Sequence, residues 1–327
     1  MNNVKVVVTD FIEPELDWEA KEMARRGVDF QTHQLKFAAS QDVITATRDA
    51  DLVIVNMVPI TTEVISQWEK CRLVIRHGVG YDNVDVKALN KVGIPLCYIP
   101  DYCAEEVAEQ AIALLLACGR KLVASRRVLD ASSAQGSWDF ADVVPMFLMA
   151  GKTLGIIGCG RIGSLVYRKL KSFGFNFLIC DPYLSEEQKR ELGIEVVDQE
   201  TVFRNSDYVT IHTPLTAETR HLVNARTLGM MKPTAYLVNT ARGPMVDVQA
   251  LAEALRNGVI AGAGIDVFEV EPPRPDFPLF GLPNAILTPH LSWYSEDSGR
   301  RIRELIVLEI DRFLSGKPPR YIANGVA

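Results

Sequence analysis

The sequence lacks the features of a secreted, membrane-spanning or nucleic-acid-binding protein. It has no block of like charges, and 35 Lys and Arg against 41 Asp and Glu give a formal charge of −6, which argues against nucleic acid or an anionic membrane as a partner. The longest apolar stretch near a possible span covers residues 111–118, far fewer than the ~20 that cross a bilayer. The first residues contain neither a charged n-region nor a long apolar h-region, so no secretory signal is expected. The six cysteines are scattered without a CxxC pair, which is typical of reduced thiols in a cytoplasmic protein.

What the sequence does contain is the pattern of a two-domain α/β protein. Its 327 residues suggest two domains, at roughly 150 residues per domain. Short β-branched runs alternate with amphipathic stretches, as in a parallel sheet covered by helices on both faces. The expected strands form two blocks, with residues 4–9, 52–55, 73–76 and 95–98 in the first and 153–157, 177–180, 208–211, 235–239, 262–265 and 285–287 in the second.

Two long helical segments set the predicted domain boundaries. Residues 104–122 form an apolar helix between the two blocks, and residues 296–314 form a helix that is expected to return the chain to the first domain. We therefore predict a discontinuous, flavodoxin-like first domain of residues 1–99 plus 295–327, and a second domain of residues 100–294. Residues 131–150 show no clean periodicity and are either an interface arm or a plain surface loop.

A glycine motif follows the first strand of the second block. Gly158, Gly160 and Gly163 form a GxGxxG sequence between an apolar run and a stretch with helical spacing. The first glycine permits a tight turn, the second lets the backbone approach a pyrophosphate, and the third allows the helix to pack closely on the strand. The amides at the helix start would then face the phosphates. The motif predicts a Rossmann domain that binds a dinucleotide, with a glycine-rich turn that holds no ligand as the alternative.

An acidic residue follows the next expected strand. Asp181 lies 18 residues after Gly163, where a carboxylate accepts hydrogen bonds from the adenosine ribose and repels a 2′-phosphate. Pro182 and Tyr183 come next, rather than an arginine. This favours NAD over NADP. The alternative is an aspartate that only starts the turn before Pro182.

Three polar side chains follow later strands of the same block. Arg242 comes after one strand, Glu269 and Glu271 after the next, and His290 after the last. Because ligands bind at the carboxyl ends of the strands in such sheets, these residues are expected on one rim. An arginine fork matches a carboxylate group, and histidine titrates near working pH and can exchange the proton that accompanies hydride transfer. The alternatives without a catalytic role are a salt bridge for Arg242, a solvated turn for Glu271 and a capping role for His290.

The chain as a whole resembles the D-isomer-specific 2-hydroxyacid dehydrogenase family, which includes phosphoglycerate, glycerate and D-lactate dehydrogenases. The resemblance covers essentially the whole chain and rests on segments 77–85, 158–163 and 212–216 together with the three strand-end motifs. It implies that Arg242 binds the substrate carboxylate and carbonyl, that His290 is the acid/base and that Glu271 tunes the histidine. Glu269 is the competing carboxylate, but the family's glutamate stands immediately before a proline, as Glu271 does.

The resemblance also implies the residues that contact cofactor and substrate. The cofactor residues are Val107, Gly158, Gly160, Arg161, Ile162, Gly163, Asp181, Thr213, Pro214, Thr219, Thr240, Ala241 and Asp266, with Asp266 near the nicotinamide amide. In the first domain, Gly78, Val79 and Gly80 are expected to offer backbone amides to the substrate carboxylate.

Two residues narrow the resemblance to one branch. Arg76 precedes the substrate loop and Trp293 follows His290, a combination similar to the C-terminal-binding-protein branch, whose tryptophan and extra arginine face the substrate. Trp293 either lines the substrate pocket or packs between domains. His77 stands where the family more often has a small residue, and it either contacts substrate or only hydrogen-bonds its own loop.

The sequence thus favours an enzyme over a binding protein. The first hypothesis is an NAD-dependent oxidoreductase, a homodimer, that acts on the CH–OH group of a small D-2-hydroxy acid or reduces the matching 2-keto acid. The alternative is an NAD(H)-sensing regulator similar to the corepressors of the C-terminal-binding-protein branch. The set of Arg242, Glu271 and His290 argues for the enzyme, since a sensor needs no acid/base. Oxidation of formate or phosphite is a third possibility, against which Arg76 and Trp293 argue weakly.

Overall fold

The computed structural model describes residues 3–326 and divides the chain into two compact units. Unit 1 is Met1–Cys103 with Ser295–Ala327, and unit 2 is Ala104–Tyr294. The first boundary therefore falls four residues later than the one predicted between residues 99 and 100. Residues 100–103 stay with unit 1 because Tyr321 donates a hydrogen bond to Asp101 and Arg301 donates one to the Tyr102 carbonyl.

Unit 1 is built on a parallel sheet of five strands. Their order is β2-β1-β3-β4-β5, which is the flavodoxin order. The strands are β1 (Lys5–Val8), β2 (Asp29–Thr32), β3 (Leu52–Val55), β4 (Leu73–Arg76) and β5 (Leu96–Cys97). The helices are α1 (Asp17–Arg25), α2 (Ser40–Thr47), α3 (Thr62–Ser66), α4 (Val86–Val92) and α12 (Glu296–Leu314). The helix predicted over residues 296–314 is confirmed, whereas the edge strand β2 was not predicted, because its sequence DFQT has no apolar run.

Unit 2 is built on a second parallel sheet, of order β11-β10-β9-β8-β6-β7. Its six strands are β6 (Thr153–Ile157), β7 (Asn176–Cys180), β8 (Tyr208–Ile211), β9 (Tyr236–Asn239), β10 (Gly262–Ile265) and β11 (Ala285–Leu287). Val196 adds a parallel bridge to Ile179 on the far side of β7. When this bridge is counted as a short strand, the order reads 3-2-1-4-5-6-7, which is the Rossmann order with one more strand.

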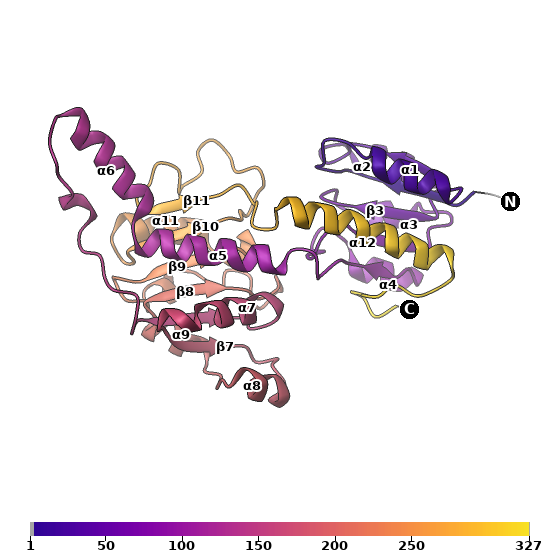
Figure 1. Cartoon of the computed structure of the whole chain (residues 1–327). Coiled ribbons are helices and arrows are strands. Elements are labelled where there is room, and N and C mark those ends of the chain that lie inside the picture. Colours follow the sequence, from indigo (N-terminus) through magenta and orange to yellow (C-terminus); the bar gives the residue numbers. More distant parts are fainter. Residues whose placement is uncertain (1–2, 327) are drawn as a thin grey trace. The chain divides into compact units, whose positions relative to one another are not determined.

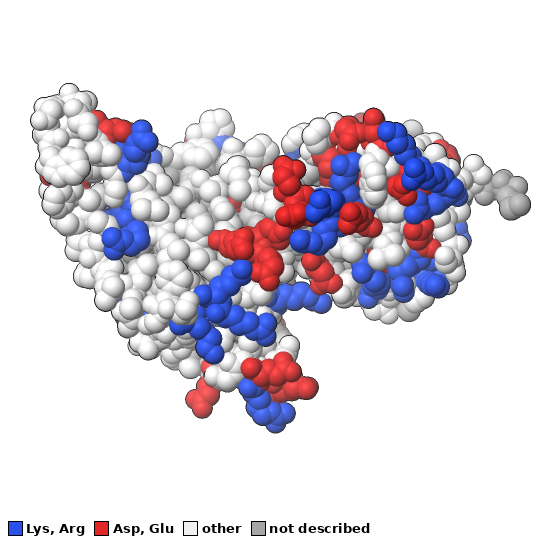
Figure 2. Space-filling view, viewed as in Figure 1, with Lys and Arg blue, Asp and Glu red and all other residues white. Residues whose placement is uncertain are grey.

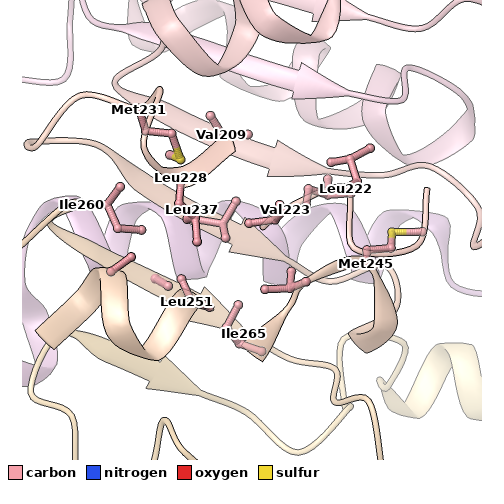
Figure 3. Packing of buried hydrophobic residues seen from close by; sticks show 14 of the residues in the cluster. Val209, Leu222, Val223, Leu228, Met231, Leu237, Met245, Leu251, Ile260 and Ile265 are labelled. Atoms are coloured by element: carbon pink, nitrogen blue, oxygen red, sulfur yellow. The ribbon is translucent and has the colours of Figure 1, made fainter. Parts of the chain in front are cut away.

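Helices cover both faces of the unit 2 sheet, and β8 shows how the sequence produces the two layers. Side chains alternate along a strand, so Tyr208 lies in the cluster beneath α5 (Ala104–Gly119) and α7 (Arg161–Leu170), while Val209 lies in the cluster on the opposite face. Figure 3 shows this second cluster, in which Val209, Leu237 and Ile265 meet Leu251 of α11. The remaining helices of the unit are α8 (Glu186–Leu192), α9 (Gln199–Asn205), α10 (Ala225–Leu228) and α11 (Val248–Arg256), with short 3₁₀ turns η1 (Ala141–Val143), η2 (Lys171–Phe173) and η3 (Gly243–Met245).

The predicted helix over residues 104–122 is corrected to two helices. The helix α5 ends at Gly119, Lys121 takes a left-handed backbone with φ of 49°, and α6 (Leu122–Ala134) begins directly after it. At Gly119 the helix lies very close to the side chain of Tyr208, because a Cβ there would lie 2.6 Å from the Tyr208 hydroxyl. Figure 1 shows α6 projecting from the body of unit 2, and among its residues only Ser132 is buried.

Within residues 3–326, no helix is both long and apolar enough to span a bilayer.

Candidate functional site

Apart from Val107 on α5, the functional residues predicted in unit 2 follow the carboxyl ends of its strands. The glycine loop leaves β6, Asp181 leaves β7, Thr213 leaves β8, Arg242 leaves β9, Asp266 leaves β10 and His290 leaves β11. Parallel strands present their carboxyl ends at one edge of the sheet, so these loops share a rim. The chain order of the sheet reverses between β6 and β8, which is where such folds bind ligands.

The glycine loop has the geometry of a phosphate cradle. A Cβ on Gly158 would lie 2.7 Å from the backbone of His212 and Thr213, and one on Gly163 would lie 2.0 Å from the Gly158 carbonyl oxygen. A Cβ on Gly160 would meet nothing within 4 Å. The outer glycines are therefore required by close backbone packing, whereas Gly160 leaves its side of the loop open to a ligand. The helix α7 begins at Arg161 and directs its first amides toward this loop.

Asp181 is tied to the glycine loop. Its carboxylate accepts a hydrogen bond from the Cys159 amide at 2.8 Å and another from the Tyr183 amide at 3.0 Å. Asp181 therefore does start the turn at Pro182, as the alternative reading has it. A carboxylate has about four lone-pair positions, so two remain for the hydroxyls of a ribose.

Two buried polar atoms on the same rim have no partner among residues 3–326. They are His212 Nδ1, after β8, and Thr240 Oγ1, after β9. Burial lowers the pKa of His212 to about 3, so its ring is neutral at physiological pH, and its Nε2 atom lies 2.9 Å from Thr210 Oγ1. Buried polar groups without partners are rare in proteins. Together with the open side of Gly160, these atoms fit a dinucleotide that lies along the rim.

The structure pairs His290 with Glu271. The distance from His290 Nδ1 to Glu271 Oε2 is 2.7 Å, and Glu271 Oε1 accepts a hydrogen bond from the Phe268 amide at 2.9 Å. Burial alone would raise the pKa of Glu271, but the hydrogen bond and charge of His290, the Phe268 amide and the charge of Arg242 together lower it. An ionised carboxylate only accepts hydrogen bonds, so Nδ1 carries a proton and Nε2 is the nitrogen available to a substrate.

The backbone of His290 is held in an unusual conformation. Its φ is 51°, a left-handed value that costs a non-glycine residue roughly 1–2 kcal/mol. The His290 amide donates to the Asp266 carbonyl at 2.7 Å, and the indole N–H of Trp293 donates to the His290 carbonyl at 3.0 Å. Bonds on both sides of the residue thus offset the strain.

Asp266 organises the loop around His290. Its side chain is fully buried and accepts hydrogen bonds from the hydroxyls of Thr288 and Ser292 and from the amides of Leu291, at 3.2 Å, and Ser292, at 3.0 Å. These four donors match the lone-pair positions of a carboxylate. The side chain therefore positions the loop that carries His290, and its contact with the nicotinamide stays a prediction.

Arg242 lies on the loop between the β8 and β10 loops. Its guanidinium donates to the Ala241 carbonyl at 2.8 Å, and its own carbonyl accepts from Asn239 Nδ2 at 2.9 Å. The adjoining Gly243 is packed so closely that a Cβ would lie 1.9 Å from the Phe268 carbonyl carbon. The other predicted cofactor residues of this rim include Thr219, whose hydroxyl donates to the Pro214 carbonyl at 2.7 Å, while Val107 is buried on α5.

The predicted substrate residues of unit 1 lie at the end of β4, where Arg76 is its last residue, and directly after it. Arg76 donates to Asn56 Oδ1 at 3.3 Å and to the His77 carbonyl. Gly78 has a φ of 147°, and a Cβ there would lie 2.6 Å from the Arg76 guanidinium, so the loop of Gly78, Val79 and Gly80 requires glycine at its start. The end of β4 and the ends of β1 and β3, between which the strand order reverses, lie at one edge of this sheet.

Sequence reasoning missed two histidine–glutamate pairs. His77 Nε2 lies 3.0 Å from Glu13 Oε1, and both side chains are nearly buried. His221 Nε2 lies 2.6 Å from Glu269 Oε1 in unit 2. The pairing of His221 with Glu269 leaves Glu271 as the partner of His290. No local sequence motif indicates either pair, because the partners lie far apart in the sequence.

A dinucleotide cradle and a histidine–carboxylate pair on one Rossmann sheet define an NAD-dependent oxidoreductase. A family model, D-isomer specific 2-hydroxyacid dehydrogenase, NAD binding domain, matches residues 112–292. The chain belongs to the D-isomer specific 2-hydroxyacid dehydrogenase family, and it is an NAD-dependent enzyme of this class.

Similar proteins include reductases and dehydrogenases of small acids. A glyoxylate reductase from Korarchaeum cryptofilum is 40% identical over 287 residues, which is 86% of this chain and 85% of that protein. D-lactate dehydrogenase from Aquifex aeolicus, solved with NAD and lactic acid, has a TM-score of 0.86 and 28% identity and covers 98% of this chain and 100% of its own. An NADPH-dependent glyoxylate/hydroxypyruvate reductase from Sinorhizobium meliloti, solved with NADP and malonate, has a TM-score of 0.84 and 30% identity over 99% of this chain and 98% of its own.

Proposed function

We propose that this protein interconverts a small 2-keto acid and the matching D-2-hydroxy acid, with His290 as the acid/base. The observation that carries the proposal is the 2.7 Å pairing of His290 Nδ1 with Glu271 on the sheet that holds the glycine cradle. Because Nδ1 is engaged, the proton is exchanged at Nε2. The proposal further rests on Arg242, whose guanidinium fork matches the carboxylate of such an acid.

In the reduction, the cofactor and three side chains would have separate roles. NADH, when bound, supplies the hydride that reaches the keto carbon. Arg242 holds the carboxylate and polarises the carbonyl, and His290 Nε2 delivers a proton to the carbonyl oxygen as it becomes a hydroxyl. Glu271 stabilises the imidazolium that is needed for this step. In the oxidative direction, neutral His290 takes the hydroxyl proton at the same atom.

The proposed substrate is a small 2-keto acid of the kind that the names of the relatives specify. Glyoxylate, hydroxypyruvate and lactate occur in those names. Arg76, His77, Gly78, Val79 and Gly80 on unit 1, with Trp293 on unit 2, are the proposed substrate-binding residues. The likeness to the C-terminal-binding-protein branch rests on Arg76 and Trp293 and stays a prediction.

The proposal is tested with a panel of 2-keto acids and NADH. The panel contains glyoxylate, hydroxypyruvate, pyruvate, 2-ketobutyrate and a branched 2-keto acid, and the rate of NADH consumption is followed at 340 nm. We expect turnover of at least one of them and, for every accepted member other than glyoxylate, whose product is achiral, formation of the D-hydroxy acid on a chiral column. The absence of turnover with every member, in either direction, would contradict the proposal.

We also propose that the protein is a homodimer that associates through the region around α6. This region exposes an unusual number of apolar side chains, namely Leu122, Val123, Leu129, Trp138, Phe140, Val144, Met146, Phe147 and Leu148. Figure 2 shows that much of its surface carries no charge. Exposed apolar patches of this kind mark contact surfaces. Light scattering should give twice the chain mass, and Trp138→Asp with Leu148→Asp should lower it to one chain.

A further inference from the structure

The loops after β8 and β10 are tied together by a side-chain bond. His221 Nε2 lies 2.6 Å from Glu269 Oε1, and the side chains are 41% and 29% exposed. The strand β9, which carries Arg242 at its end, lies between β8 and β10 in the sheet. The bond therefore joins the two loops that flank the arginine loop.

The arginine loop contacts both partners of this bond. On one side, the His221 amide donates to the Pro244 carbonyl at 2.9 Å. On the other side, a Cβ on Gly243 would lie 2.4 Å from the Glu269 amide nitrogen, so the two backbones are in direct contact. His221, Pro244, Gly243 and Glu269 thus form a closed ring of contacts directly after Arg242.

The ring is anchored in the core at its ends. Leu222, Val223 and Met245 point into one apolar cluster in Figure 3, and all three are buried. The amide of Val223 donates to the Met245 carbonyl at 2.9 Å. The core does not hold the exposed part of the ring. There, among residues 3–326, His221 and Glu269 form the only side-chain bond between the β8 and β10 loops.

The conformation of His221 adds a second observation. Its φ is 49°, in the left-handed region that is uncommon for residues other than glycine, and its side chain is 41% exposed. Strained residues of this kind persist where the surroundings determine them and cluster at functional sites. A half-exposed bond between two such side chains contributes little to global stability. The pair therefore acts mainly on the loop that lies between its two partners, which is the loop after β9.

We infer that His221 and Glu269 are positioning residues for Arg242. The pair holds the loop after β9 so that the guanidinium keeps the orientation in which it can grip a substrate carboxylate with two parallel bonds. A shift of ~1 Å in such a group can cost ~100-fold in rate, so a small loosening of the loop is measurable. This inference rests on the proposed function, in which Arg242 binds the substrate.

The test compares variants that break the bond with one that preserves it. His221→Asn accepts the left-handed backbone but is too short to reach Glu269, and Glu269→Ala removes the acceptor. Glu269→Gln keeps an oxygen at the same position. Glu200→Ala, which breaks a 2.6 Å pair with Arg226 on the same unit, is the matched control.

We expect both bond-breaking variants to raise KM for the best 2-keto acid by about 10-fold while kcat changes less than about 3-fold. The double variant should be no worse than either single variant, since both remove the same bond. Glu269→Gln and Glu200→Ala should stay near the wild-type KM, and Tm should fall by less than about 3 °C in every case. An unchanged KM in the bond-breaking variants, or a KM that rises only together with a large loss of Tm, would overturn the inference.

Hydrogen exchange keeps this test separate from that of the proposed function. The Met245 amide donates to the Arg242 carbonyl at 3.3 Å and the Val246 amide donates to the Gly243 carbonyl at 3.0 Å, so their exchange rates report the loop directly. Both amides should exchange faster in His221→Asn and Glu269→Ala, but not in Glu200→Ala. If the wild type reduces no keto acid, the proposed function fails. Unchanged exchange of these two amides in the bond-breaking variants would refute the positioning role of His221 and Glu269 independently of turnover.

Discussion

The Nδ1 atom of His290 lies 2.7 Å from Glu271 Oε2, and Glu271 is at the same time held by the Phe268 amide. The two residues come from the loops after β11 and β10, which are neighbours in the sheet. The pairing fixes which ring nitrogen is engaged, and so it makes the proposed roles of both residues testable.

Replacing Glu271 by Gln should move the pH dependence of reduction. The glutamine carries no charge that could stabilise the imidazolium from which the proton is donated. The descending limb of log kcat/KM for keto acid reduction should therefore shift to lower pH. A profile that does not move would count against Glu271. Glu269→Gln is the matched control and should leave the limb in place.

Replacing His290 by Ala should abolish most turnover without affecting cofactor binding. The loss of proton transfer should lower kcat by about 10²–10⁴-fold. The Kd for NADH, measured by protein fluorescence, should stay within about 3-fold, since the glycine loop is not altered. Asparagine also adopts the left-handed backbone found at His290, so His290→Asn should be at least as stable as His290→Ala. It should be equally inactive, because it cannot transfer the proton. A near-normal kcat in either variant would refute the acid/base role.

The charge of Asp181 should decide the choice between NADH and NADPH. Asp181→Asn keeps an oxygen that can accept from the Cys159 amide but loses the charge that repels a 2′-phosphate. The ratio of kcat/KM for NADH to that for NADPH should fall by about 10-fold in this variant. Asp181→Ala should weaken NADH use further, because the glycine loop also loses a hydrogen bond. A wild type that prefers NADPH would refute the assignment.

The pair of Glu13 and His77 should make unit 1 sensitive to acid. Burial alone would raise the pKa of Glu13, but the hydrogen bond and charge of His77 lower it to about 2. A lowered pKa stabilises the fold above the unfolded pKa of about 4.5 and loses this effect as the pH falls. The free energy of unfolding by urea should therefore drop by about 2 kcal/mol more in the wild type than in Glu13→Gln between pH 5 and pH 3.

The control for this prediction is an exposed glutamate that pairs with a lysine on unit 2. Glu186 contacts Lys189 at 2.7 Å with 79% of its side chain exposed, so Glu186→Gln should behave as the wild type. Equal pH dependence in Glu13→Gln and the wild type would mean that the pair contributes nothing to stability.

Much of the fold followed from local sequence because most strands are buried on both faces. Runs such as Leu52–Val55 and Tyr208–Ile211 are continuous and apolar, and the structure has strands there with the same bounds. The edge strand Asp29–Thr32 has no such run, since its side chains are half-buried or exposed. The break after α5 was missed because the sequence is apolar up to Cys118, and only the contact of Gly119 with Tyr208 shows why the helix ends there.

The candidate site divides in the same way. Residues that follow strands, such as Arg242 and His290, are found from the sequence because the rim of a parallel sheet collects them. The partners of His77 and His221 could not be found, since Glu13 and Glu269 reach them only through the tertiary fold. The two carboxylates alone do not indicate which one turns toward His290. The resemblance to the family, whose glutamate precedes a proline, selected Glu271, and the structure pairs Glu271 with His290.

Trp293 should determine which keto acids are accepted. Its indole N–H donates to the His290 carbonyl at 3.0 Å, and its ring meets Tyr294 edge-on at 5.3 Å between centroids, so the side chain is held close to His290. We expect Trp293→Ala to favour longer or branched keto acids over small ones, because an apolar face beside the substrate is removed, with little change in Tm. Trp293→Phe keeps most of the apolar face but loses the N–H, so it should keep the substrate ranking and lower kcat for all members alike. If Trp293 instead packs between domains, Trp293→Ala should lose ~3–5 kcal/mol of stability and should reduce the activity with all substrates equally. Thermal melts beside the substrate panel separate these outcomes, and a uniform loss of activity with a large drop in Tm would exclude the specificity role.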